Sequence, residues 1–262
     1  MAEHHWDLRV AIAMAEMRQR GVAFSRQEML RQRALHLQRA KEAERKARKA
    51  GLDVSLASPQ QVAAGLAALD IDTGKYGKTG MSTDAEALGA ALAECREIHG
   101  TPAADACVND CTDQIKALEA VLAFREHKKV DSTYIVGYGK FMRNGVIKAD
   151  WLYPGTETWR PRCRAPNLLN IPRGEFRKCV VSHHEGGSIL SADYSQIELR
   201  VLASLSEDPL MLEIYRQGKD IHSTTARNVW GRKFTKHQRY VAKRINFGTI
   251  YGMSAPRLQD IL

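Results

Sequence analysis

The chain has 262 residues, a length that suits one large domain or two smaller ones. Its hydrophobic fraction of 44% and charged fraction of 26% exclude a disordered or fibrous chain. No apolar run reaches the roughly 18 residues of a membrane span, so we expect no membrane partner. The net charge of +9 favours a polyanion such as nucleic acid, with an acidic partner or simple solubility as alternatives.

Five cysteines are present, and no two of them form a Cys-x-x-Cys pair. The first residues also lack the basic-then-apolar pattern of a secretion signal. We therefore expect free, reduced thiols and a cytoplasmic location.

Apolar residues at helical spacing predict helices across residues 5–50, with a break at Gly21. Ser25 is placed to cap the helix after the break, and Ser58 to cap a short further one. Residues 38–49 alternate in charge sign with a basic excess. They form either a solvated helix face or a basic arm along a nucleic-acid backbone.

Residues 72–83 are rich in Gly, Lys and Thr and predict a loop. This loop either contacts phosphates through its amides and lysines or is a plain surface loop. Helices are expected at about 84–98 and 112–129, with a loop near 100–110 between them.

After Lys129 the sequence pattern changes from helical to strand-like. Residues 132–142 and 146–154 flank Asn144-Gly145 and predict a β-hairpin. Residues 188–193 predict a short strand that ends in Asp193. Because strands follow a helical first half, the expected class is α+β. Further helical patterns cover about 195–205, 208–217, 220–230 and 235–251.

Two segments carry candidate chemistry. A carboxylate at a strand end, as expected for Asp193, is well placed to hold metal ions, and Glu198 lies about one helical turn further on. The simpler interpretation is that Asp193 caps a helix.

In the second segment a capping-box pattern at Thr235 starts a helix. Two cations and two aromatic residues then recur at intervals of four: Arg239, Lys243, Phe247 and Tyr251. In one interpretation the stripe binds a nucleoside triphosphate, with the cations on the phosphates and an aromatic ring on the base. In the other it belongs to an amphipathic helix with a solvated basic end and a packed aromatic end.

These segments resemble family A DNA polymerases, the bacterial polymerase I and bacteriophage polymerase group. DYSQIELR, residues 193–200, resembles motif A, and the Arg-x3-Lys-x3-Phe-Gly-x2-Tyr-Gly pattern from residue 239 resembles motif B. KDIHSTTA resembles a further fingers segment, and PNLLNIPRG resembles a primer-template-contacting segment. AEMRQRGVAF, SPQQVAAGL and KTGMST resemble the thumb, so the likeness covers nearly the whole chain in the family's order.

The resemblance implies a right-hand polymerase fold, with mostly helical thumb and fingers around a partial antiparallel palm sheet. The thumb would span residues 1–130, the partial palm with motif A 131–207, and the fingers with motif B 208–262. The implied function is template-directed DNA synthesis in DNA replication, in which dNTPs are added to a primer 3′-hydroxyl on primer-template DNA. Two Mg²⁺ ions would support the transfer.

The resemblance also implies residue roles. Asp193 would bind both Mg²⁺ ions through its side chain and Tyr194 through its backbone carbonyl. Arg239 and Lys243 would be catalytic and hold the triphosphate, and Glu198 would exclude a ribose 2′-hydroxyl. The residues assigned to the nucleotide are Tyr194, Gln196, Glu198, His222, Phe247 and Tyr251. Those assigned to DNA are Arg160, Asn167 and Asn170.

Two departures fall on the primer-contacting segments: Trp159 replaces the glycine of a Thr-Gly-Arg segment, and Leu169 replaces a glutamine. The family's motif C, His-Asp-Glu, does not occur in the sequence. We therefore expect an incomplete enzyme that is inactive alone and has a palm edge that exposes apolar surface. The remainder with motif C would be on a second polypeptide, or would simply not be included in this sequence. An inactive remnant and a pure DNA- or nucleotide-binding module are the alternatives.

Overall fold

The computed structural model of the chain describes residues 3–78, 80–99, 111–259 and 261. The expected loop near residues 100–110 therefore lies outside the described residues. The chain forms two compact units, Met1–Ile189 and Leu190–Leu262. The three-part division at residues 130 and 207 stays a prediction. Among the described helices, none is long and apolar enough to cross a membrane.

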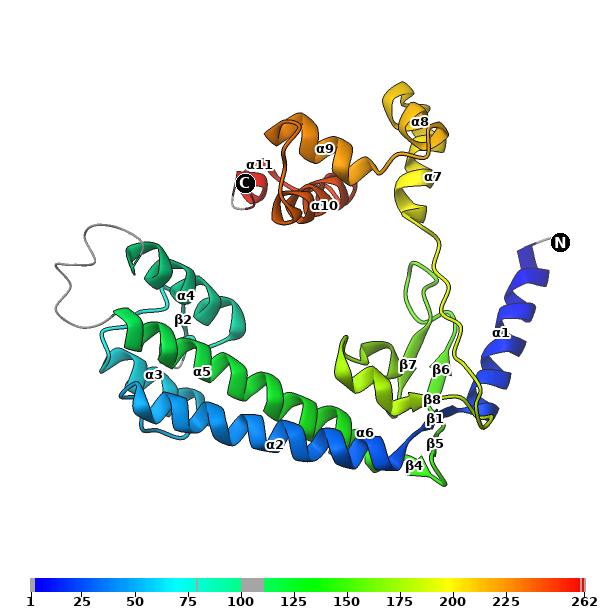
Figure 1. Cartoon of the computed structure of the whole chain (residues 1–262). Helices are drawn as coiled ribbons and strands as arrows, with labels where there is room; N and C mark the ends of the chain where they lie inside the picture. Colours follow the sequence, from blue (N-terminus) through cyan, green and yellow to red (C-terminus); the bar gives the residue numbers. More distant parts are fainter. Residues whose placement is uncertain (1–2, 79, 100–110, 260, 262) are drawn as a thin grey trace. The chain divides into compact units, whose positions relative to one another are not determined.

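The first unit is built around two long helices. α2 (Arg26–Lys49) and α5 (Cys111–Lys129) lie side by side, and α4 packs on α5 (Figure 1). Ser25 caps α2 as predicted, because its hydroxyl accepts a hydrogen bond from the Glu28 amide at 3.2 Å. The other elements of this part are α1 (Glu3–Arg20), α3 (Pro59–Ala67), α4 (Ala85–His99), β2 (Tyr76–Gly77) and β3 (Gly80–Met81).

Small side chains line the contact between the two long helices. Ala43 and Ala47 of α2 and Ala117 and Ala120 of α5 are all buried in one core cluster. Because a methyl group takes little space, the helix axes can approach closely there. Leucines such as Leu88 then fill the core between these helices and α3 and α4.

The described residues of the first unit also form three small antiparallel sheets. The largest has the order β4-β5-β1-β8, and Ala23 pairs with Val146 on one side and Val181 on the other; β2 pairs with β3, and β6 with β7. The predicted turn at Asn144-Gly145 is confirmed, with positive φ values of 50° and 77°. The strands are β1 (Val22–Phe24), β4 (Met142–Arg143), β5 (Val146–Ile147), β6 (Asp150–Leu152), β7 (Arg162–Arg164) and β8 (Val180–Val181).

The prediction of a strand over residues 132–142 is wrong for most of that range. The chain there forms the π-helix η2 (Val130–Val136) and the short helix α6 (Gly137–Gly139). One helical turn places Tyr134 and Tyr138 together, with ring centroids 5.6 Å apart, in a core cluster with Phe176. Burial of these aromatic rings outweighs the β-propensity of the local sequence.

Irregular chain follows the sheets, with the 3₁₀ turns η3 (Leu168–Asn170) and η4 (Glu175–Cys179). Cys163 and Cys179 are buried in the same core, and burial raises the pKa of the Cys179 thiol to about 11. These two are free thiols, as predicted.

The second unit is helical. Its predicted helices are confirmed, and α9 and α10 lie side by side (Figure 1). Leu199, Ile214 and Ile221 form its small core, and both halves of the capping box at Thr235 are present. The helices are α7 (Ile197–Ser206), α8 (Pro209–Arg216), α9 (Ile221–Trp230), α10 (Lys236–Ile250) and α11 (Ala255–Gln259).

The predicted strand over residues 188–193 is also wrong. Residues 187–194 form neither helix nor strand. A strand needs a hydrogen-bonded neighbour, and in the part of the chain that the structure describes no strand pairs with this segment. Ile189 and Leu190 in this segment are 57% and 92% exposed. The α+β class is confirmed.

Candidate functional site

Motif A places its predicted metal ligands in exposed backbone ahead of α7. Asp193 and Tyr194 are both exposed, and Asp193 has no hydrogen-bond or ion-pair partner among the described residues. The described residues contain no group of three or more His, Cys, Asp or Glu side chains that could hold a metal ion. Asp193 and Tyr194 therefore do not form a two-ion site by themselves.

Gln196 connects the start of α7 to α8 and to α9. Its φ of 55° lies in the left-handed region, just before the first residue of the helix. Its Nε2 donates to Asp220 Oδ1 at 2.8 Å, and its Oε1 accepts a bond from the Tyr215 hydroxyl at 3.3 Å. The predicted nucleotide-binding residue is therefore already engaged within the unit.

Asp220 is a functional candidate that sequence reasoning missed. It caps α9 by accepting bonds from the Ser223 amide at 3.0 Å and hydroxyl at 2.6 Å. The same carboxylate accepts a bond from Arg239 Nε at 2.8 Å, and Arg239 Nη2 also lies 2.8 Å from it. An Asp just before a helical pattern is the sequence signal of such a cap. Nothing in the sequence pairs it with Arg239.

The surroundings of Asp220 keep its carboxylate ionised. Partial burial acts to raise its pKa, but hydrogen bonds from Ser223, Arg239 and Gln196 act the other way and prevail. The pKa of Asp220 is therefore held well below its usual range. Arg239 thus has a permanent anionic partner at neutral pH.

The predicted stripe on α10 is present on one face of the unit. Lys243 Nζ lies 5.9 Å from the centre of the Phe247 ring. The Phe247 and His222 ring centroids are 5.7 Å apart, so α9 and α10 each contribute a ring. Arg239 and Lys243 are both exposed, which leaves their cationic ends accessible to an anion.

His222 is 3% exposed, and its Nδ1 lies 3.0 Å from Asn246 Nδ2. Burial is the largest cause that lowers its pKa below the ordinary value of 6.5. The cations Arg239 and Lys243 lower the pKa further, and Asp220 opposes them. The imidazole is therefore neutral at pH 7.

The end of α10 contacts the first turn of α7. The Tyr251 hydroxyl donates to Glu198 Oε2 at 2.8 Å. The structure therefore joins the last residue of the predicted stripe to the predicted sugar-selecting carboxylate.

The three predicted DNA-binding residues lie in irregular chain of the first unit. Asn167 shapes η3, because its Oδ1 accepts a bond from the Leu169 amide at 3.1 Å. The backbone amide of Arg160 donates to Thr156 Oγ1 at 3.1 Å and so closes a turn. Both residues and Asn170 are exposed, as is Leu169 at 55%.

The comparisons with known proteins give the family. The model of DNA polymerase family A matches residues 26–262. The chain belongs to DNA polymerase family A. DNA polymerase I of Thermus filiformis is 41% identical over 155 residues, which cover 55% of this chain and 18% of that protein. DNA polymerase I of Lactococcus lactis subsp. cremoris is 33% identical over 216 residues, 78% of this chain and 22% of that protein.

The fold is similar to that of a solved polymerase domain. The structure described as the POL domain of Pol1 from M. smegmatis, in complex with DNA primer-template and dNTP, matches with a TM-score of 0.78 and 27% identity. The match covers 97% of this chain and 43% of that one. The family A chain thus spans less than half the length of the proteins it matches.

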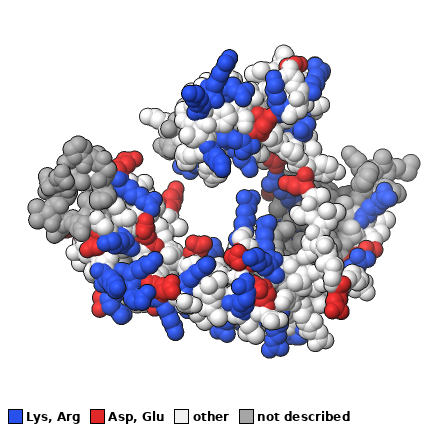
Figure 2. Space-filling model, viewed as in Figure 1, with Lys and Arg blue, Asp and Glu red and all other residues white. Residues whose placement is uncertain are grey.

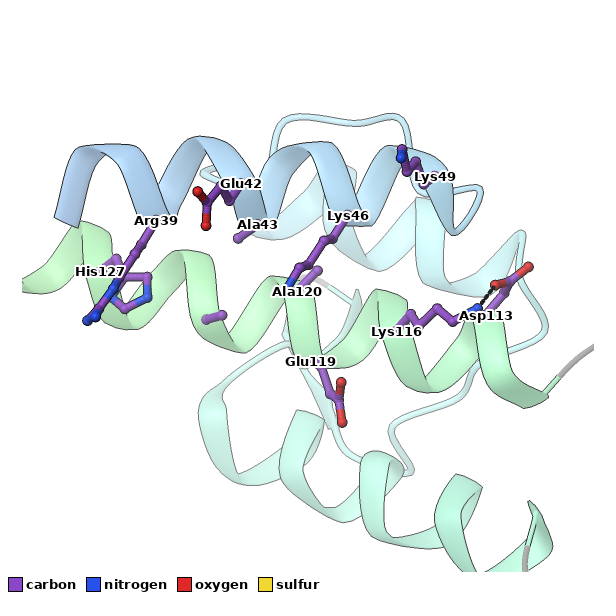
Figure 3. Close-up of a pocket in the computed structure, with 11 residues that line it drawn as sticks. Arg39, Glu42, Ala43, Lys46, Lys49, Asp113, Lys116, Glu119, Ala120 and His127 are labelled. Atoms are coloured by element: carbon purple, nitrogen blue, oxygen red, sulfur yellow. Dashed lines mark hydrogen bonds and ion pairs between the residues drawn. The ribbon is translucent and has the colours of Figure 1, made fainter. Parts of the chain in front are cut away.

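A basic groove of this family A polymerase chain lies between α2 and α5. It encloses about 650 Å³, and its floor contains Ala43 and Ala120. Figure 3 shows Arg39 and Lys46 extending from α2 across the groove toward α5. The charged or titratable side chains that line it are Arg39, Glu42, Lys46, Lys49, Asp113, Lys116, Glu119 and His127.

Most acidic side chains of the groove already have cationic partners. Asp113 lies 2.9 Å from Lys116, and Glu119 lies 2.7 Å from Arg96. Arg39, Lys46 and Lys49 have no ion-pair partner among the residues that the structure describes. The groove therefore has a surplus of positive charge, and Figure 2 shows Lys and Arg gathered on both units.

Proposed function

We propose that this chain binds primer-template DNA and dNTPs in template-directed DNA synthesis, as the nucleotide- and DNA-binding part of a DNA-directed DNA polymerase. The observation that carries the proposal is the shared face of α9 and α10, where two exposed cations, a neutral imidazole and an aromatic ring lie together. The family match over residues 26–262 and the likeness to a polymerase domain bound to primer-template and dNTP support it.

In this proposal Arg239 and Lys243 bind the oxygens of the triphosphate. A charge-assisted hydrogen bond of this kind contributes about 1.5–3 kcal/mol. Arg239 keeps donors for a phosphate while it is bound to Asp220, because a guanidinium has five N–H groups. The Phe247 ring then lies against the sugar and base of the same nucleotide.

Glu198 is proposed to select the sugar. Its carboxylate is fixed by the Tyr251 hydroxyl at 2.8 Å, so it has a defined place in the site. A fixed carboxylate at the C2′ position excludes a 2′-hydroxyl by contact and leaves room for deoxyribose. The product of synthesis is therefore DNA.

Membership of the family implies use of a divalent metal. The Asp193 carboxylate and the Tyr194 carbonyl are hard oxygen ligands of the kind that Mg²⁺ prefers. However, the described residues supply no cluster of three candidate ligands, so the residues present do not fit two ions. We propose that carboxylates on a second polypeptide complete the site.

The exposure of Asp193, which has no partner among the described residues, also favours a second candidate function. Without further carboxylates, the chain would hold DNA or nucleotide with no chemistry of its own. Binding of dNTP in the presence of Mg²⁺ separates the two. If the chain is part of a polymerase, Asp193→Ala should weaken Mg²⁺-dependent binding of dNTP. If it is a pure binding module, Asp193→Ala should leave this binding unchanged.

The nucleotide assignment is tested with Arg239→Ala and Lys243→Ala. Each should weaken dNTP binding by about tenfold or more and primer-template binding by much less. Arg244→Ala is the matched control, because it removes an exposed cation from the same helix outside the predicted stripe. Equal loss of dNTP and DNA binding would contradict the proposal and indicate a general basic surface.

A further inference from the structure

Asn246 of α10 lies against His222 of α9. We infer that Asn246 is a positioning residue: it fixes the neutral His222 ring with its proton on Nε2, which then donates to a phosphate oxygen of the bound nucleotide. The inference rests on the proposed function, in which the shared face of α9 and α10 that contains His222 binds the nucleotide. Beyond that function, the inference assigns the donor to Nε2 of a neutral ring and names Asn246 as the residue that fixes this tautomer.

The hydrogen bond between the two side chains determines where the proton lies. Asn246 Nδ2 is 3.0 Å from His222 Nδ1. An amide nitrogen only donates, so Nδ1 must accept with its lone pair and carry no proton. In a neutral imidazole the single proton is then on Nε2.

A third side chain binds the other end of the amide. The Thr225 hydroxyl donates to Asn246 Oδ1 at 3.0 Å. Thr225 and His222 are three residues apart on α9, so they lie on the same face and hold the amide from both ends. With its oxygen bound to Thr225, Asn246 presents its nitrogen to His222.

The opposite edge of the ring is left available. Nε2 of His222 has no hydrogen-bond partner in the described part of the chain. Among the described residues, Gln32 Oε1 is the one side-chain nitrogen or oxygen that is buried without a hydrogen-bond partner. Nε2 of His222 has no partner and is not such a buried atom, so it is reached by solvent. The Phe247 ring, proposed to lie against the nucleotide, is 5.7 Å from the imidazole.

The charges around His222 favour this neutral form. Burial of the ring is the largest cause that opposes its protonation, Asp220 at the start of α9 favours protonation, and the cations Arg239 and Lys243 of α10 oppose it. A neutral ring with a random tautomer would present its donor only part of the time. The Thr225–Asn246–His222 chain of bonds keeps the donor on Nε2 throughout the neutral pH range.

The direct test is the tautomer of His222 in the 262-residue chain. Long-range ¹H–¹⁵N NMR at pH 8 distinguishes the protonated from the unprotonated ring nitrogen, and a His222→Gln variant identifies the signals. We expect Nδ1 to be unprotonated and Nε2 protonated. A proton on Nδ1, or rapid averaging between the two tautomers, would overturn the inference.

Asn246→Asp supplies the second test. The carboxylate has nearly the same shape but accepts only, so it should move the proton to Nδ1 and raise the pKa of His222 by about 1–3 units. Binding of inorganic triphosphate should then depend on pH: retained below the raised pKa, where both ring nitrogens carry protons, and weakened about tenfold above it.

Asn228→Asp is the control, because it adds the same charge to an exposed position of α9. Comparison of Asn246→Asp with Asn228→Asp at each pH cancels the effect of the titration of triphosphate itself. A carboxylate stays ionised over this pH range, so its repulsion of triphosphate would not vary with pH. A pH profile that matches the control would overturn the inference. If triphosphate does not bind the wild-type chain at any pH although Nε2 is protonated, the proposed function fails and the positioning by Asn246 stands.

Discussion

At the residue scale, the proposed nucleotide site depends on contacts that join α9 to α10, namely Arg239 with Asp220 and Asn246 with His222. Spacing of four along one helix was enough to place Lys243 and Phe247 together. Asp220 and Asn246 could not be found in this way, because their bonds join residues 19 and 24 positions apart on two helices. Such contacts depend on how α9 packs against α10, which local periodicity does not specify.

Sugar selection gives a prediction at this scale. Glu198→Ala should narrow the preference for dNTP over ribonucleotide by roughly ten- to hundredfold, because the contact with the 2′-hydroxyl is removed. Tyr251→Phe keeps the ring but removes the hydrogen bond to Glu198, and should narrow the preference by about fivefold. Equilibrium binding of labelled nucleotides to the chain with primer-template measures both.

Tyr240→Phe is the matched control for the tyrosine change. Tyr240 lies in α10, the helix that ends just before Tyr251, and is 58% exposed, so removal of its hydroxyl should leave the preference unaltered. An unchanged dNTP preference in Glu198→Ala would remove the assignment of Glu198 to the sugar.

At the element scale, helices with caps and strong periodicity were predicted well, and short strands were not. Ser25 and Thr235 are local signals, and both cap the expected helices. Residues 132–142 are rich in β-branched and aromatic residues, which favour a strand. Most of this range is nevertheless helical, because a helical turn buries Tyr134 and Tyr138 together in the core. Residues 188–193 have the pattern of a strand, but a strand forms only beside a partner.

The contact between α2 and α5 contains a pair of histidines with a pH consequence. His36 Nδ1 and His127 Nδ1 are 3.1 Å apart. Burial lowers the pKa of both, and the neighbouring His127 and Arg39 lower that of His36 further, while Glu126 opposes this in both. Below about pH 6.5 the unfolded chain therefore binds more protons than the folded chain, and the folded state loses stability as the pH falls.

Thermal unfolding of the chain at pH 7.5 and pH 5.5 checks this prediction. The melting temperature should fall with pH, and the fall should be smaller in a His36→Gln/His127→Gln variant, which has no ring to protonate. His184→Gln/His237→Gln removes two exposed histidines and serves as the control. An equal fall in the wild type and in the His36→Gln/His127→Gln variant would show that the pair does not titrate with unfolding.

At the scale of the whole molecule, the chain has a net charge of +9. Composition alone left nucleic acid, an acidic partner and solubility open as explanations. The family match and the groove between α2 and α5, where Arg39 and Lys46 have no ionic partner in the described residues, now favour nucleic acid.

Binding of duplex DNA should therefore weaken steeply with salt, because each phosphate that a cation neutralises releases counterions. Arg39→Ala/Lys46→Ala should reduce the slope of log K against log salt by about 0.9 for each phosphate that the variant no longer neutralises. The control is Arg48→Ala/Lys178→Ala, which removes two cations that lie outside the groove and are paired with Asp53 and Glu175. A slope that changes equally in both variants would rule out the groove as a site of phosphate binding.

The irregular backbone of residues 187–194 has a consequence for proteolysis. Leu190 is 92% exposed and Tyr194 81%, and both are side chains after which chymotrypsin cuts. An exposed peptide without a strand or helix to protect it is a ready protease substrate. The bonds open to the enzyme lie on either side of Asp193, so a ligand held there and a protease compete for the same stretch of chain.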